Sequence, residues 1–240
     1  MEILNTLRSQ IEQGDIPEYE HLEKLRALRE EIEDIEDILQ GNPNPSLRVV
    51  RQKSKGSGFA VVVGHTNEQQ GAQSVSPINS SEYRWNTNLA QMIKSECDKL
   101  GIECKIFFRD GIGISGAYKR VGQWGAKCVV ELHFNASNGK ALGSETLYDA
   151  GKNAHSKGWA ETLQREIVAV FDRSGKADRG LREVNPGDRG YASCSALNIP
   201  SALVEPFFGD NKFDALLAHQ HKDDLASAIA EAAKKFVSIS

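Results

Sequence analysis

Three short apolar runs, separated by helical sequence, constrain the fold of this chain more than any other feature. They lie at Phe59–Gly64 (FAVVVG), Lys127–His133 (KCVVELH) and Pro200–Glu205 (PSALVE). Unbroken apolar strands that alternate with helices are typical of a parallel sheet with both faces covered. The sequence therefore predicts an α/β fold with a mostly parallel, twisted sheet and helices on both faces. In such sheets, ligands bind beyond the carboxyl ends of the strands.

The other expected elements continue this alternation. Short runs with strand composition lie at 104–108, after the first helix, and at 144–148, after the second apolar run. Apolar side chains at helical spacing predict helices over 82–100, 115–125, 156–172 and 219–237.

The first 41 residues differ from the rest in both charge and periodicity. They contain twelve acidic and four basic side chains, whereas the whole chain has a formal net charge of −4, so the remainder is mildly basic. Apolar residues at alternating spacings of three and four form a helical seam at Leu25, Leu28, Ile32, Ile35 and Leu39. We expect an N-terminal helical segment over 1–41, a hairpin or short coiled coil, which packs either on its own chain or on a second copy as a homo-oligomer. Proline, glycine and polar residues predict a linker over 42–57, followed by the main domain at 58–240.

Composition excludes several classes of protein. No apolar run approaches the ~20 residues of a membrane span, and the acidic start lacks the apolar core of a secretory signal, so we expect synthesis in the cytoplasm. No basic stripe indicates a nucleic-acid partner. The four cysteines are dispersed without a Cys-x-x-Cys pair, which is typical of buried, reduced thiols rather than a metal or redox motif.

Polar side chains that suit metal chemistry follow the three apolar runs. His65 follows the first, His133 ends the second and Glu205 ends the third. Glu82 opens the helix expected at 82–100, whose first turn faces the same edge of a parallel sheet. Alone, each residue has an ordinary structural explanation, such as helix capping for Glu82. Together, two histidines and a carboxylate form a common catalytic zinc set with one position open for water.

The order of these motifs resembles the zinc-dependent N-acetylmuramoyl-L-alanine amidase family of type 3, which includes phage endolysins and bacterial cell-wall hydrolases. The resemblance covers roughly residues 58–237. Two shorter stretches also resemble that family, at Arg109-Asp110 and at Gly143-Ser-Glu145-Thr. Its main motifs appear here as Gly64-His65, Glu82, Glu131-Leu-His133-Phe-Asn135-Ala-Ser137 and Leu203-Val-Glu205-Pro-Phe-Phe-Gly-Asp-Asn211.

The resemblance implies a zinc ion held by His65, Glu82 and His133. It implies that Glu205 is the catalytic carboxylate, which would take a proton from water and hand it to the departing alanine nitrogen. Glu68 follows His65 closely and is an alternative to Glu82 as the third ligand. The residue two before His133 is glutamate here, where the family often has serine.

Two further residues are candidates for contact with the substrate or the ligands. Asn135 either binds substrate, orients a ligand or caps the turn after its strand. Glu145 is a candidate for a supporting position beside the ligands.

The implied reaction is hydrolysis of the amide between N-acetylmuramic acid and L-alanine in peptidoglycan, by zinc-activated water. The enzyme would act on the cell wall after release by lysis or a separate export route, and a phage endolysin is the first expectation. The alternatives are another zinc peptidase or deacylase on this fold, or a non-catalytic cell-wall-binding module. The G-x-G-x-x-G pattern at 111–116, with Glu131 twenty positions later, also resembles a dinucleotide-binding fingerprint, although Asp110 would place negative charge near a pyrophosphate.

Overall fold

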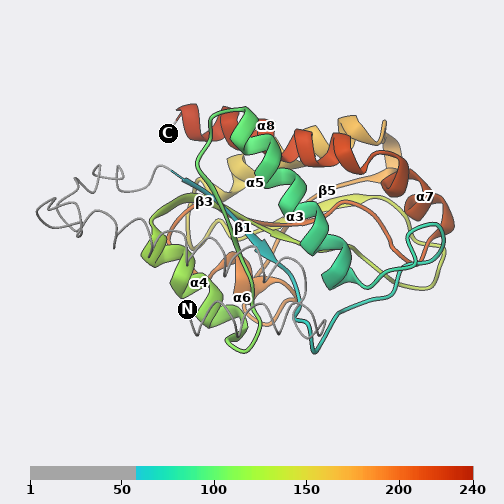
Figure 1. Ribbon diagram of the computed structural model, residues 1–240, viewed down its shortest axis with the longest axis horizontal. Coiled ribbons are helices and arrows are strands. Elements are labelled where there is room, and N and C mark those ends of the chain that lie inside the picture. The colour runs from blue at the N-terminus through green and yellow to red at the C-terminus, as the bar shows by residue number, and fades with distance from the viewer. Residues whose placement is uncertain (1–57, 240) are drawn as a thin grey trace, which may run out of the picture. The chain divides into compact units, whose positions relative to one another are not determined.

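The structure is a computed structural model that describes residues 58–239 (Figure 1). The expected helical segment at 1–41, its proposed self-association and the linker at 42–57 lie outside the described residues. The strands are β1 (Gly58–Val63), β2 (Cys104–Phe107), β3 (Ala126–Leu132), β4 (Ser144–Tyr148), β5 (Asp178–Glu183) and β6 (Ser201–Glu205). The helices are α3 (Glu82–Lys99), α4 (Gly113–Trp124), α5 (Ser156–Val170), α6 (Tyr191–Cys194), α7 (Lys212–Gln220) and α8 (Lys222–Ile239), with a 3₁₀ turn at Gly175–Ala177.

The strands form one sheet in the order β2-β1-β3-β6-β4-β5. Every neighbouring pair is parallel except β4 and β6, which run antiparallel. The expected α/β fold with a mostly parallel sheet is therefore confirmed. The three apolar runs that predicted it form β1, β3 and β6, which are adjacent at the centre of the sheet.

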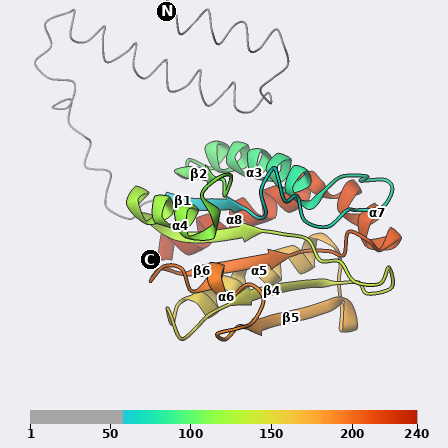
Figure 2. The same ribbon diagram turned by 90° about the horizontal axis from the view of Figure 1, so that it is seen from below.

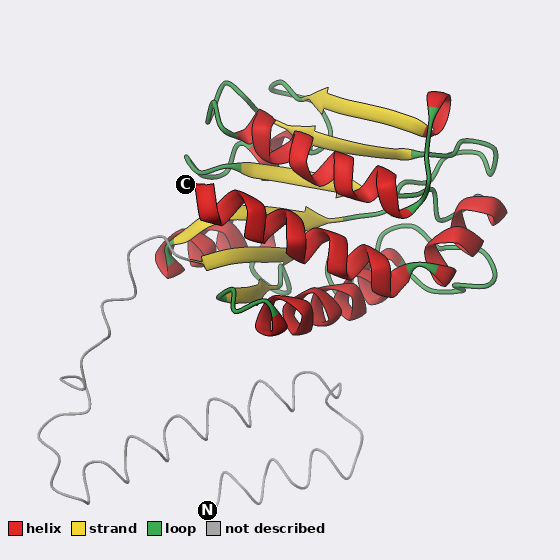
Figure 3. Cartoon of the chain, turned by 90° about the horizontal axis from the view of Figure 1, so that it is seen from above, coloured by secondary structure: helices red, strands yellow, loops and turns green. Residues whose placement is uncertain are grey.

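Helices cover both faces of the sheet. Figure 3 shows α3, α5 and α8 across one face, and Figure 2 shows α4 and α6 against the other. The larger core lies under α3, α5 and α8, where the rings of Phe59 and Trp159 meet edge to face with centroids 5.8 Å apart. Trp159 also donates from Nε1 to the carbonyl of Val129 at 2.8 Å, so the buried indole has a hydrogen-bond partner.

Side chains of β3 alternate between the two cores. Cys128, Val130 and Leu132 face α3, α5 and α8, whereas Val129 faces α4. Residues two apart in a strand share a face, so Glu131 lies on the α4 side with Val129. The two-residue repeat of the strand therefore places the Glu131 carboxylate on an otherwise apolar face, two residues before His133.

The sequence pattern missed β5, α6 and α7. The strand β5 has the sequence DRGLRE and lies at the edge of the sheet, where charged side chains reach solvent and no apolar run is needed. The expected helix at 219–237 begins at Lys222, and a separate helix, α7, precedes it. Asn211 caps α7, because its side-chain oxygen accepts from the amides of Phe213 and Asp214 at 2.9 and 3.2 Å.

Two further observations bear on the class of protein. None of the helices within residues 58–239 combines the length and hydropathy needed to cross a membrane. All four cysteines are buried and unpaired, as the sequence predicted.

Candidate metal centre and active site

The carboxyl ends of β1, β3 and β6 bring the predicted site residues to one edge. Val63 pairs with Leu132, and Leu132 pairs with Val204, so the strands end in register. The residue after Leu132 is His133, and the residue after Val204 is Glu205. His133 donates from its backbone amide to the carbonyl of Val204 at 3.0 Å, which extends the pairing into the site.

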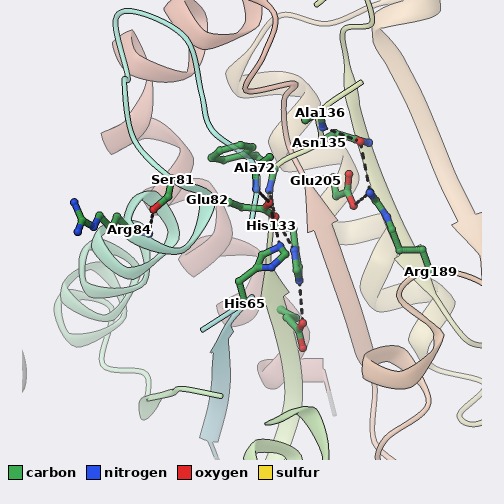
Figure 4. A network of polar contacts seen from close by, with 12 residues as sticks. His65, Ala72, Ser81, Glu82, Arg84, His133, Asn135, Ala136, Arg189 and Glu205 are labelled. Atoms are coloured by element: carbon green, nitrogen blue, oxygen red, sulfur yellow. Dashed lines mark hydrogen bonds and ion pairs between the residues drawn. The ribbon is translucent and has the colours of Figure 1, made fainter. Parts of the chain in front are cut away.

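Glu82 joins this edge from the start of α3. Ser81 is the N-cap of that helix, and its hydroxyl accepts from the amide of Arg84 at 3.3 Å. The Glu82 carboxylate therefore does not cap the helix. It turns toward the two histidines, with Oε1 2.7 Å from Nδ1 of His133 and Oε2 3.1 Å from Nε2 of His65 (Figure 4).

Backbone amides complete the environment of Glu82. Ala72 donates to Oε2 at 3.2 Å and Phe134 donates to Oε1 at 3.1 Å. Burial acts to raise the pKa of Glu82, but hydrogen bonds and the charges of His133 and His65 outweigh it and lower that pKa to about 2. Glu82 is consequently an anion at neutral pH, which suits a cation between the three side chains.

The three side chains fit a metal ion. The candidate ligand atoms of His65, Glu82 and His133 lie within 4.8 Å of one another. Two imidazoles and one carboxylate are a common ligand set for catalytic zinc. Gly71 leaves room beside them, because a Cβ there would lie 2.6 Å from Oε2 of Glu82 and 2.7 Å from Nε2 of His65.

The backbone around His65 is held in a conformation that non-glycine residues seldom adopt. Its φ is 66°, in the left-handed region, and such outliers concentrate at functional sites. Asp110 links the loop after His65 to α3, since it accepts from the amide of Asn67 at 2.6 Å and from the hydroxyl of Tyr83 at 2.8 Å. Glu68, the alternative ligand, is exposed in this loop and lies outside the cluster.

Glu205 lines the same cavity, of about 340 Å³, as the two histidines and Glu82. It is 2% exposed. Arg189 binds its Oε1 through Nη2, whereas Oε2 is buried without a hydrogen-bond partner among the described residues. Burial raises the pKa of Glu205, and the positive charge of Arg189 limits the rise.

Asn135 and Glu145 lie beside Glu205 rather than beside the metal cluster. Asn135 donates to Oε1 of Glu145 at 2.5 Å, and its own oxygen accepts from the amide of Ala136 at 3.1 Å. That oxygen also lies 3.5 Å from Nη2 of Arg189. Asn135 thus caps the turn after β3 and also connects Glu145 to Arg189.

Three residues at the site were not assigned a role from the sequence. Arg189 lies in an exposed loop and had no recognisable motif. Gly71 is one of 21 glycines in the chain, and nothing in the sequence distinguished it. Glu131 was noted as a difference from the family and as the acidic residue of the dinucleotide-like pattern, although its spacing of two from His133 predicts that both side chains share one face of the extended chain.

The glycine-rich segment at 111–116 leads into the first turn of α4 and contributes Ile114 to the same cavity. Arg109 and Ile114, on either side of its first glycines, line the cavity wall. The acidic residue that a dinucleotide-binding site would require, Glu131, is fully buried and hydrogen-bonded to Tyr118. It is therefore not available to bind a ribose hydroxyl.

Known proteins share both the sequence pattern and the fold. The family profile described as N-acetylmuramoyl-L-alanine amidase matches residues 60–235. No curated protein sequence is similar enough to count as a relative.

Three solved structures illustrate the likeness in fold. The catalytic domain of CwlV, an N-acetylmuramoyl-L-alanine amidase from Bacillus (Paenibacillus) polymyxa var. colistinus, has a TM-score of 0.64 at 21% identity, covering 76% of this chain and 99% of its own. The amidase AmiC2 of Nostoc punctiforme has a TM-score of 0.63 at 20% identity, covering 77% and 99%. The catalytic domain of an endolysin targeting Clostridia difficile has a TM-score of 0.62 at 25% identity, covering 75% and 97%.

The family match spans nearly all of the described residues, and the fold agrees with it. The chain therefore belongs to the N-acetylmuramoyl-L-alanine amidase family and is an enzyme that hydrolyses the amide between N-acetylmuramic acid and L-alanine in peptidoglycan.

Proposed function

We propose that this hydrolysis depends on zinc bound by His65, Glu82 and His133, with Glu205 as the general base. The proposal rests on two groups of side chains that line one cavity. One is the cluster of two imidazoles and an anionic carboxylate, and the other is a buried carboxylate with an unpartnered oxygen. When bound, zinc supplies a Lewis acid that polarises the amide carbonyl and makes water acidic enough to attack at neutral pH.

Glu205 would move the proton. Its Oε1 is held by Arg189, which leaves Oε2 to accept a proton from the attacking water. The same oxygen would return that proton to the departing alanine nitrogen, because an amine leaves poorly unless it is protonated. Burial supports this shuttle, since it raises the pKa of Glu205 toward the working pH.

Removing the charge of Arg189 is expected to move the acidic limb of the pH–rate profile to higher pH. Arg189 lowers the pKa of Glu205, so Arg189→Gln raises that pKa, and the basic form is then lost at a higher pH as the solution is acidified. Measurement of kcat/KM against pH with a soluble muramoyl peptide tests this. Arg189→Lys keeps the charge and serves as the control. An acidic limb that stays in place in Arg189→Gln would show that this arginine does not tune Glu205.

Digestion of purified peptidoglycan tests the reaction and the metal together. The protein is expected to release stem peptides with a free N-terminal alanine, identified by mass spectrometry. A zinc chelator should abolish the release, and added zinc should restore it. The reason is that imidazole and carboxylate ligands bind metal reversibly, so the ion can be removed and replaced. Intact stems, or cuts within the peptide, would contradict the amidase reaction. Activity that survives complete chelation would contradict the zinc site alone.

We further propose that the enzyme acts as an endolysin. The catalytic domain of an endolysin is among the similar structures, at 25% identity over 75% of this chain, which supports this assignment. Comparing digestion of isolated walls with clearing of intact cells, with the protein added from outside or produced inside, distinguishes a lytic enzyme from one that remodels walls without lysis.

A further inference from the structure

The polar residue behind His133 is Glu131, on the side of the imidazole that faces away from Glu82. Glu131 is 0% exposed. Its Oε1 lies 2.9 Å from Nε2 of His133 and 2.8 Å from Nη1 of Arg109. Its Oε2 accepts from the hydroxyl of Tyr118, in α4, at 2.8 Å.

A carboxylate is costly at this position. Other side chains on the α4 side of the sheet are apolar, such as Val129 and Val121. A buried charge is tolerated only when it is paired and hydrogen-bonded. Both oxygens of Glu131 have partners, because Oε1 faces His133 and the guanidinium of Arg109, and Oε2 accepts from the hydroxyl of Tyr118. The network therefore maintains an anion at a fixed place behind the imidazole.

The two ring nitrogens of His133 lie in different surroundings. Nε2 packs against the backbone of Gly64, where a Cβ would come within 2.4 Å of it, and it faces Glu131. Nδ1 faces Glu82, on the side of the cluster with His65. Each ring nitrogen therefore faces a carboxylate, but only Nδ1 lies on the side of the proposed ligands. A metal ion held there would take the place of a proton on Nδ1, so the single N–H of the neutral imidazole would stay on Nε2, where Glu131 accepts it. The lone pair of Nδ1 then points into the cluster.

We propose that Glu131 is a positioning residue of the metal centre, which orients His133 and selects the tautomer that binds zinc through Nδ1. Arg109 and Tyr118 hold Glu131 in place. The inference rests on the proposed zinc site. Carboxylates that accept the second N–H of a ligating histidine increase metal affinity by about 10–100-fold, and this sets the expected effect.

The wild-type protein provides the first test. Long-range ¹H–¹⁵N spectra of the zinc-loaded protein distinguish a protonated ring nitrogen from a metal-bound one. The expected pattern for His133 is a protonated Nε2 and a zinc-bound Nδ1, assigned by the signals that disappear in His133→Ala. The reverse pattern would overturn the inference, and Glu131, Arg109 and Tyr118 are all unchanged in the protein whose tautomer is measured.

Zinc affinity provides the second test, measured by competition with a chromophoric chelator. Glu131→Gln is expected to bind zinc about 10–100-fold more weakly than wild type. Tyr118→Phe keeps Glu131 but removes one of its partners, so it should give a smaller loss in the same direction. The d–d spectrum of the cobalt-substituted protein should also change in Glu131→Gln, because that spectrum reports ligand geometry rather than stability.

Asp214→Asn is the matched control for the loss of a buried carboxylate. Asp214 is 1% exposed and pairs with Arg173 at 3.0 Å, but it touches none of the three proposed ligands. The Asp214→Asn variant should be less stable than wild type but should keep the wild-type zinc affinity. Equal weakening in Asp214→Asn and Glu131→Gln would overturn the positioning role. Unchanged zinc affinity in Glu131→Gln would also overturn the positioning role, but it would leave the proposed zinc site intact. A wild-type protein that binds no zinc would overturn the zinc site itself.

Discussion

Glu205→Gln is expected to reduce turnover of peptidoglycan by about 10²–10⁴-fold, the usual contribution of a general base or acid, while zinc stays bound. Glutamine has nearly the same shape but cannot take a proton from water. The buried position of Glu205 makes this substitution informative, because solvent does not readily replace a base that is 2% exposed. Turnover with a soluble muramoyl peptide and zinc content per chain are the two measurements.

Glu145→Gln is a useful comparison for that experiment. Glu145 lies opposite Glu205 in the antiparallel pair of β4 and β6, so it samples a nearby environment. Both oxygens of Glu145 already have protein partners, through Asn135 and Arg179. Its substitution should therefore reduce turnover far less than Glu205→Gln does. A Glu205→Gln enzyme with full activity would refute the base, and one that loses its zinc would make Glu205 part of the metal centre instead.

The sequence predicted which residues lie together at the candidate site because the information lies at strand ends. Continuous apolar runs identified β1, β3 and β6, and parallel strands must bring their carboxyl ends to one edge. His65, His133 and Glu205 were therefore placed together without any knowledge of side-chain packing. The position of Glu82 followed from the same reasoning, since the first turn of α3 returns to that edge.

Contacts made by residues away from these strand ends could not be predicted from the sequence. Arg189 reaches Glu205 from a loop between β5 and α6, two elements with no apolar run or helical period to reveal them. Glu131 offered a weak signal in its spacing of two from His133. That spacing predicts a shared face, but it does not reveal that Tyr118 and Arg109 converge there from other parts of the chain.

Glu82→Gln is expected to weaken zinc binding by more than about 100-fold, because it removes the anionic ligand of the proposed site. Loss of a residue that only hydrogen-bonds to a ligand weakens metal binding by up to about 100-fold, and loss of the ligand itself should cost more. The amide is neutral, so it no longer balances the charge of the metal. Its NH₂ group also cannot accept from the amides of Ala72 or Phe134, which costs further stability. Zinc affinity, peptidoglycan turnover and the circular dichroism spectrum should be measured together, so that loss of metal is separated from loss of fold.

Glu68→Gln makes that experiment decisive between the two acidic residues that follow His65. Both substitutions remove one negative charge near the same histidine, so a loss caused by long-range attraction alone would appear in both variants. Glu68 is exposed, where its charge is screened by solvent and salt, and it is not one of the three grouped side chains. Its variant should keep wild-type zinc affinity and turnover. If Glu68→Gln loses zinc and Glu82→Gln retains it, the loop after β1 must rearrange to supply the third ligand, and Glu82 is instead a hydrogen-bonding link between α3 and the two histidines.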